Sequence, residues 1–133
     1  MRDDDISTLI SYRLEQAQTA LDDAKFLFEG QRSPQSIVNR AYYAMFYASL
    51  ALLQKVGKVP SKHSGVVSLF DTEFVLKGIF SKELSRDIHK AFELRQLTDY
   101  KTSKPISPER TKETLDNAVR FVMTVKKYLL GIS

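Results

Sequence analysis

The sequence has no cysteine among its 133 residues. Disulfide bonds, thiolate metal sites and cysteine nucleophiles are therefore excluded, and the composition fits an intracellular protein. The chain begins with Met1, Arg2 and three aspartates, an acidic start, whereas a secretory signal peptide has a basic and then an apolar region. No apolar run reaches the roughly 20 residues needed to cross a bilayer. We therefore expect a soluble cytoplasmic protein with no membrane association.

The sequence patterns of common enzymes are also missing. The chain has no glycine-rich phosphate loop, no His-Glu-x-x-His helix and no nucleophile elbow. Of its two histidines, His89 has only Glu93 one helical turn away, and His63 has no acidic residue at that spacing. These are too few ligands for a metal site. We predict no metal and no cofactor, and we expect His89 to lie on a solvent-exposed helix flank.

Charge is unevenly distributed along the chain, whose net charge is +4. Residues 1–30 carry seven acidic and three basic side chains, whereas residues 31–133 carry nine acidic and seventeen basic ones. A basic region of this kind is compatible with a phosphate-bearing partner. Lysines scattered over exposed helix faces give the same count, and the sequence favours this simpler explanation.

A stretch without charge lies between Arg40 and Gln54. Its apolar residues recur at helical spacing in two neighbouring stripes: Val38, Ala41, Met45, Ala48 and Leu52, then Tyr42, Phe46, Ser49 and Leu53. A helix that is apolar over most of its circumference, yet too short for a bilayer, must be covered by other helices. The pattern predicts a central helix that begins after the Ser33-Pro34 start signal and ends near Val56 and Gly57.

Four further helices are predicted around the central one by the same periodicity. They cover residues 6–29, residues 62–75, the stretch from a Ser81 cap to about residue 100, and the stretch after Ser107-Pro108. Gly30 is expected to end the first of them in the left-handed conformation. The turn at residues 76–80 is expected to pack its apolar residues on the bundle. The fold class is therefore all-α, an up-and-down antiparallel bundle of four to five helices in a single domain over residues 1–133.

Two positions have both a structural and a functional interpretation. Arg95 and Asp99, one turn apart on an inward-facing row, form either a helix salt bridge or a site in which the guanidinium holds phosphate. His63 lies near a helix start, where it either packs or helps to bind an anion. Among the tyrosines, we expect Tyr42 in the core, and Tyr43 and Tyr47 at a cleft or a dimer interface.

Four segments in the same order resemble the HEPN domain family, and most closely its small stand-alone UPF0332-type branch. They are residues 39–47 (NRAYYAMFY), residues 62–65 (KHSG), residues 95–100 (RQLTDY) and residues 118–122 (AVRFV). The resemblance implies a helical bundle that commonly dimerises, with a cleft near the family's motif arginine. HEPN proteins occur in toxin–antitoxin systems, many are encoded beside a nucleotidyltransferase, and active members are metal-independent endoribonucleases.

The ribonuclease motif of that family is an arginine followed, after four to six residues, by a histidine. The arginine matches Arg95, but the histidine would fall on Tyr100, Lys101 or Thr102. The general base of the active members is thus missing, and a tyrosine with an ordinary pKa of about 10 replaces it poorly.

The leading hypothesis is a homodimeric protein that binds RNA or a nucleotide, or that partners a nucleotidyltransferase antitoxin, and that is not an enzyme. Arg95 would hold phosphate and Asp99 would orient it. His63, Arg40 and Tyr100 would line the cleft. The alternative is an endoribonuclease toxin that uses Arg95 with His63 or Tyr100, and a third hypothesis is a purely structural partner without a ligand.

Overall fold

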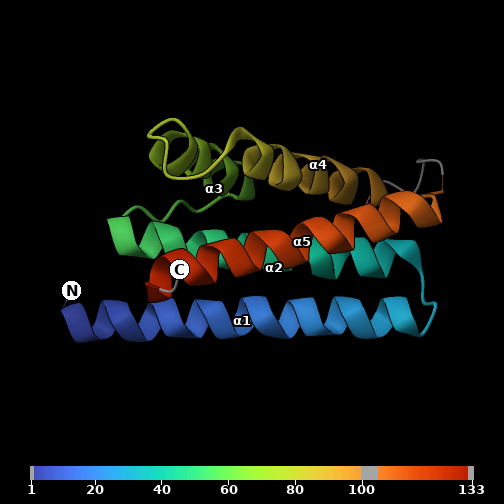
Figure 1. Cartoon of the computed structure of the whole chain (residues 1–133), viewed down its shortest axis with the longest axis horizontal. Helices are drawn as coiled ribbons and strands as arrows, with labels where there is room; N and C mark the ends of the chain where they lie inside the picture. The colour runs from blue at the N-terminus through green and yellow to red at the C-terminus, as the bar shows by residue number, and fades with distance from the viewer. Residues whose placement is uncertain (1, 100–104, 132–133) are drawn as a thin grey trace.

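Helices make up most of residues 2–99 and 105–131, which are the residues that the computed structural model describes. Their order is α1 (Asp3–Glu29), α2 (Pro34–Val56), α3 (His63–Phe70), a π-helical turn η1 (Asp71–Val75), α4 (Lys82–Asp99) and α5 (Pro108–Leu130). No strand occurs within these ranges. Figure 1 shows α1, α2, α4 and α5 running alternately in opposite directions. The predicted all-α up-and-down bundle is confirmed.

Helix α2 lies at the centre and contacts α1, α3, α4 and α5. In Figure 1, α1 lies on one side of the α2–α5 pair, and α3 and α4 lie on the other. All nine residues of the two predicted stripes are buried. Burying a large apolar side chain contributes roughly 1.5–3 kcal/mol, so α2 supplies much of the energy that holds the bundle together.

Local capping signals define the ends of α2 and the start of α5. The Ser33 hydroxyl accepts a hydrogen bond from the Ser36 backbone N–H at 3.2 Å, and the Ser107 hydroxyl accepts one from the Arg110 N–H at 3.1 Å. Gly57 closes α2 in the left-handed conformation, with φ of 73°. These three predictions are confirmed, because each depends only on residues within one helical turn.

The end of α1 differs from the prediction at Gly30. Its φ is −82°, and the left-handed conformation is adopted one residue later by Gln31, with φ of 54°. The Gly30 N–H still bonds to the Phe26 carbonyl at 3.0 Å, so the helical hydrogen-bond pattern extends through the glycine. A non-glycine residue in this conformation costs roughly 1–2 kcal/mol, so Gln31 is a strained position.

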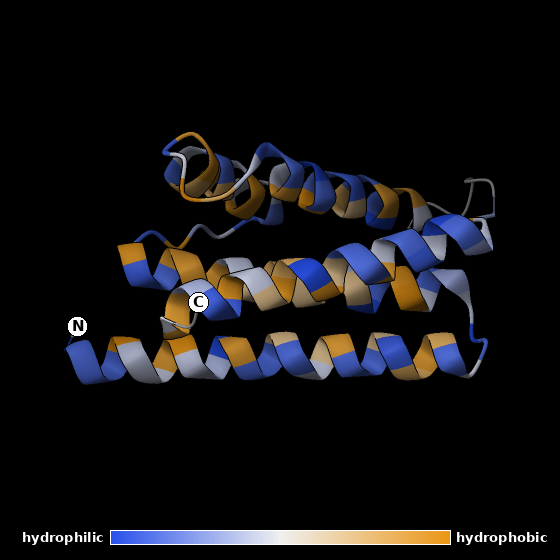
Figure 2. Cartoon of the chain, viewed as in Figure 1, coloured by the Kyte–Doolittle hydropathy of each residue, from blue (hydrophilic) through white to orange (hydrophobic). Residues whose placement is uncertain are grey.

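The segment between α2 and α4 contains the second difference. Phe80 packs inward as expected, but Leu76 and Ile79 are 77% and 41% exposed, so the prediction that this turn buries its apolar residues is wrong for both. The backbone N–H groups of Ile79 and Phe80 both bond to the Phe74 carbonyl, at 2.8 and 3.1 Å. This tight closure turns Phe80 toward the core and leaves Leu76 and Ile79 exposed; Figure 2 shows hydrophobic residues in this turn between α3 and α4.

The start of α3 is held close to the connector before it. A Cβ atom added to Gly65 would lie 3.0 Å from the Pro60 Cβ. Glycine is favoured at this position, despite its cost inside a helix, because the two segments approach so closely. The contact holds the connector against the first turn of α3, whose first residue is His63.

Candidate functional site

Aromatic side chains gather where α3 and α4 pack on α2. We call this group the aromatic cluster: Tyr42, Tyr43, Phe46 and Tyr47 of α2, His63 of α3 and Phe92 of α4. The spacing of the four α2 members places them on one side of that helix. Three helices therefore contribute rings to one surface, and two of the predicted arginines contact it.

The tyrosines of the aromatic cluster differ in burial. Tyr42 has no exposed surface, and its ring centroid lies 5.3 Å from that of Tyr43 and 5.8 Å from that of Phe92. It is a core residue, as predicted. Tyr43 and Tyr47 are partly exposed, with ring centroids 5.8 Å apart. Their predicted role at a cleft or dimer interface stays a prediction.

His63 is packed against the core on one side. Its ring stacks on Phe46 with centroids 4.1 Å apart, and its Nδ1 lies 3.1 Å from the Tyr42 hydroxyl oxygen. Burial, and then the positive charge of Arg95, lower the pKa of His63 below its ordinary value. The imidazole is therefore neutral near pH 7. The packing that the sequence suggested for His63 is present, whereas its role in anion binding stays a prediction.

Arg95 lies across the same tyrosines. Its Nη2 donates a hydrogen bond to the Tyr43 hydroxyl at 3.3 Å. Its guanidinium carbon lies 5.7 Å from the Tyr42 ring centroid and 5.5 Å from that of Tyr43. Both distances are in the range of a cation–π contact. The Asp99 side chain and Tyr100 lie outside the described residues, so their predicted roles beside Arg95 stay predictions.

Arg40 approaches Tyr43 from within α2. Its Nε and Nη2 both donate to the Asn39 side-chain oxygen, at 3.1 and 3.0 Å, and its guanidinium carbon lies 5.1 Å from the Tyr43 ring centroid. Arg40 also lines two hollows, one of about 440 Å³ and one of about 290 Å³. Thr98 of α4 lines the larger hollow and Tyr47 lines the smaller one.

The structure thus brings four of the predicted site residues to one surface, namely Arg40, Tyr43, His63 and Arg95. Two guanidinium groups on one tyrosine ring, beside a neutral imidazole, make a surface that is both aromatic and positively charged. Guanidinium groups bind phosphate with paired hydrogen bonds, and exposed aromatic rings stack with nucleic-acid bases.

Comparison with known proteins supports the same family as the motifs. The HEPN domain family matches residues 10–128. This chain belongs to the HEPN domain family. A "UPF0332 protein" of Thermotoga maritima is 39% identical over 121 residues, which are 91% of each chain. A protein of Methanocaldococcus jannaschii named "Putative toxin" is 37% identical over 128 residues, covering 96% of this chain and 94% of its own.

A second Methanocaldococcus jannaschii protein with the same kind of toxin name is 33% identical over 118 residues, or 89% of this chain and 80% of its own. The relatives of this HEPN protein thus include a UPF0332 protein and two proteins named as putative toxins. The residues that would complete a ribonuclease motif after Arg95, at positions 100–102, lie outside the described part of the chain.

One polar cluster of this HEPN protein was not predicted from the sequence. His89 is half-exposed, as expected, but its Nε2 lies 2.6 Å from the Asp71 carboxylate, and the Ser85 hydroxyl donates to the other oxygen of that carboxylate at 2.6 Å. Asp71 belongs to η1 and is 18 residues away in sequence, so no helical spacing reveals the pair. His89 thus lies on the exposed flank that the sequence predicted, and its ion pair with Asp71 is an addition to that prediction.

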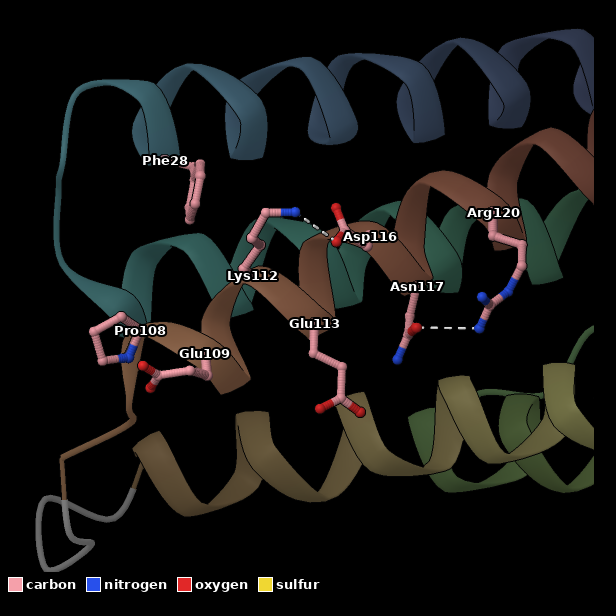
Figure 3. A pocket seen from close by; sticks show the side chains of 8 residues that line it. All are labelled: Phe28, Pro108, Glu109, Lys112, Glu113, Asp116, Asn117 and Arg120. Atoms are coloured by element: carbon pink, nitrogen blue, oxygen red, sulfur yellow. Dashed lines mark hydrogen bonds and ion pairs between the residues drawn. The ribbon is translucent and has the colours of Figure 1, made fainter.

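A further hollow lies elsewhere, as a groove of about 640 Å³ (Figure 3). It is lined mainly by polar and charged residues of α5, among which Lys112 pairs with Asp116 at 2.8 Å and Arg120 donates to the Asn117 side-chain oxygen at 3.1 Å. The Lys112, Asp116 and Arg120 side chains already have protein partners, which makes them less available to a ligand. The groove contains none of the predicted site residues.

Two classes of feature are not found within the described ranges. No group of three or more histidine, aspartate or glutamate side chains is placed to hold a metal ion there. Among the helices of residues 2–99 and 105–131, none combines the length and the apolar character that a membrane crossing requires.

Proposed function

We propose that this HEPN protein binds single-stranded RNA or a nucleotide at the aromatic cluster, as a homodimer in a toxin–antitoxin-like pair with a nucleotidyltransferase. The observation that carries the binding proposal is the approach of Arg40 and Arg95 to within 5.1 and 5.5 Å of the Tyr43 ring centroid. The names of two relatives, both called putative toxins, support the proposed toxin–antitoxin-like pair.

The contacts suggest how a strand would be held. The Arg95 guanidinium lies on the Tyr42 and Tyr43 rings, and a guanidinium is suited to holding phosphate oxygens through paired hydrogen bonds. Tyr43 and Tyr47 are partly exposed, and stacking a base on such a ring is worth roughly 1–3 kcal/mol. The two hollows beside Arg40 give room for neighbouring nucleotides.

Fluorescence anisotropy with a labelled single-stranded RNA of mixed sequence tests the proposal. Because a charge-assisted hydrogen bond contributes roughly 1.5–3 kcal/mol, Arg95→Ala should weaken binding about ten- to a hundredfold. The slope of log K against log salt should also fall by about 0.7, the value for one lost phosphate contact on a single strand.

Arg86→Ala is the matched control. Arg86 lies on the same helix as Arg95 and is exposed, so this variant removes the same charge from a different face of α4. It should bind RNA within about twofold of the parent. Equal losses in the two variants would mean that only net charge matters, and that the aromatic cluster is not the binding surface.

A second candidate function is a metal-independent endoribonuclease, which the neighbourhood of His63 and Arg95 favours. The lowered pKa of His63 keeps its imidazole unprotonated near pH 7, as a general base must be. Labelled RNA is incubated with the protein in chelator. Cleavage that is lost in Arg95→Ala and in His63→Ala would establish this function in place of simple binding.

The assembly part of the proposal has its own measurements. A homodimer is tested by sedimentation at micromolar concentration, where a single species at the monomer mass of 15.2 kDa would exclude it. The nucleotidyltransferase partner is tested by co-expressing the product of the neighbouring gene. A neighbouring gene of another class, together with no stable complex, would remove this part of the proposal.

A further inference from the structure

The bond between Tyr42 and His63 determines which nitrogen of the imidazole carries the proton. The Tyr42 hydroxyl oxygen lies 3.1 Å from His63 Nδ1, and Tyr42 has no exposed surface. His63 Nε2 has no hydrogen-bond partner among the described residues and is not among the buried atoms that lack one. Nδ1 therefore faces the core, and Nε2 is open to solvent.

Two proton arrangements fit this distance. In the first, the Tyr42 O–H donates to Nδ1, and the neutral ring carries its hydrogen on Nε2. In the second, an Nδ1–H donates to the Tyr42 oxygen, and the hydroxyl hydrogen needs another acceptor. No other described residue accepts from it, and bulk water does not reach a side chain without exposed surface. A buried donor without an acceptor is costly enough to disfavour the second arrangement by about tenfold or more.

We propose that Tyr42 is a positioning residue that holds His63 in the Nε2–H tautomer, so that His63 offers a hydrogen-bond donor, and not a base, to a phosphate bound beside Arg95. The tautomer follows from the protein alone, whereas the phosphate contact rests on the proposed function. The two parts therefore have separate tests.

The groups around the His63 imidazole also favour the Nε2–H tautomer. Among the described residues, the ionisable groups that contact or influence the ring are Tyr42 and Tyr43 of α2 and Arg95 of α4. Burial raises the pKa of Tyr42, so its hydroxyl keeps its hydrogen. Burial and Arg95 lower the pKa of His63, so Nδ1 stays free to accept that hydrogen.

This arrangement has a chemical consequence for the nuclease alternative. A neutral ring with its hydrogen on Nε2 has its free electron pair on Nδ1, which points at Tyr42. Nε2, the nitrogen that faces solvent, cannot remove a proton from a ribose 2′-hydroxyl. It can donate to a phosphate oxygen, as the N–H groups of arginine do.

The tautomer is measured directly by NMR of the ¹⁵N-labelled full chain without ligand, in which the shifts of the two ring nitrogens identify the protonated one. We expect the His63 Nε2 to be the protonated nitrogen at pH 7.5. In Tyr42→Phe, which keeps the ring and removes the hydroxyl, this preference should weaken to a mixture of tautomers. Predominant Nδ1 protonation in the parent protein would overturn the proposal.

The phosphate contact is measured by RNA anisotropy on two variants of His63. A glutamine amide nitrogen reaches about as far as Nε2 and donates, so His63→Gln should recover most of the affinity that His63→Ala loses, which we expect to be about tenfold. Equal losses in the two variants, with unchanged thermal melting, would overturn the donor role. If the parent protein binds no RNA, the proposed function and the phosphate contact fall together, while the NMR result still decides the tautomer.

Discussion

Two ion pairs of nearly equal length differ in the burial of their carboxylates, and the arginine of the more buried pair also lies 3.5 Å from Glu83. Arg120 meets Asp87 at 2.7 Å, and Lys112 meets Asp116 at 2.8 Å. In the first pair the carboxylate side chain is 7% exposed and the arginine 47%, whereas in the second pair both side chains are about 60% exposed (60% and 59%). The basic residue of each pair is changed to methionine, which keeps an unbranched apolar chain and removes the charge.

The expected losses in the free energy of unfolding differ severalfold between the two variants. Removing one partner of a fully buried pair costs about 3–5 kcal/mol because the other charge is left without a partner. Arg120 is half-exposed, so water partly replaces it, and we expect Arg120→Met to cost about 2 kcal/mol. Lys112→Met should cost only about 0.3–0.5 kcal/mol, the value of an exposed pair one helical turn apart.

Urea unfolding measures both variants. With a slope of about 1.5 kcal/mol per molar urea, the midpoint should fall by about 1.3 M in Arg120→Met and by about 0.3 M in Lys112→Met. Adding Asp87→Asn to Arg120→Met removes the stranded charge and should recover more than half of the loss. Equal shifts in the two single variants, or no recovery in the double variant, would refute the reasoning from burial.

Two further predictions concern the connections between helices. Gln31→Gly should stabilise the protein by up to about 1 kcal/mol in thermal melting, because glycine adopts the φ of 54° at Gln31 without strain; an unchanged or lower melting temperature would contradict this. Hydrogen bonds from Lys58 and then from Lys77, at 2.9 and 3.2 Å, lower the pKa of Glu73 below its ordinary value of 4.5. Because the folded pKa is the lower one, this contribution to stability is present above pH 4.5 and is lost as the pH falls through the folded pKa. The stability difference between the parent and a Lys58→Met, Lys77→Met variant should therefore shrink with acidification below pH 4.5, and a difference that stays constant would contradict the assignment.

The sequence predicts features that depend on neighbouring residues and misses those that depend on contacts between helices. Ser33, Gly57 and Ser107 act within one turn of chain, so their helix boundaries could be placed in advance. The exposure of Leu76 could not be predicted, because it depends on how the turn after η1 closes on the Phe74 carbonyl.

The candidate site shows the same division. Helical spacing and the family motifs identified Arg95, Arg40 and His63 as separate candidates. Their meeting at Tyr43 and Tyr42 joins residues up to 52 positions apart in sequence, as for Arg95 and Tyr43. The hydrogen bond that orients His63 comes from Tyr42, a residue that the sequence assigned only to the core.

The central position of α2 has a consequence for the order in which the molecule opens. A helix that contacts all four other α-helices exchanges its amide hydrogens only when most of the bundle unfolds, whereas peripheral helices open at lower free energy. Tyr42 and Tyr43 belong to α2, but His63 and Arg95 belong to α3 and α4. Undocking of these outer helices would therefore dismantle the site while the core persists, so binding at the site should slow hydrogen exchange in α3 and α4 more than in α2.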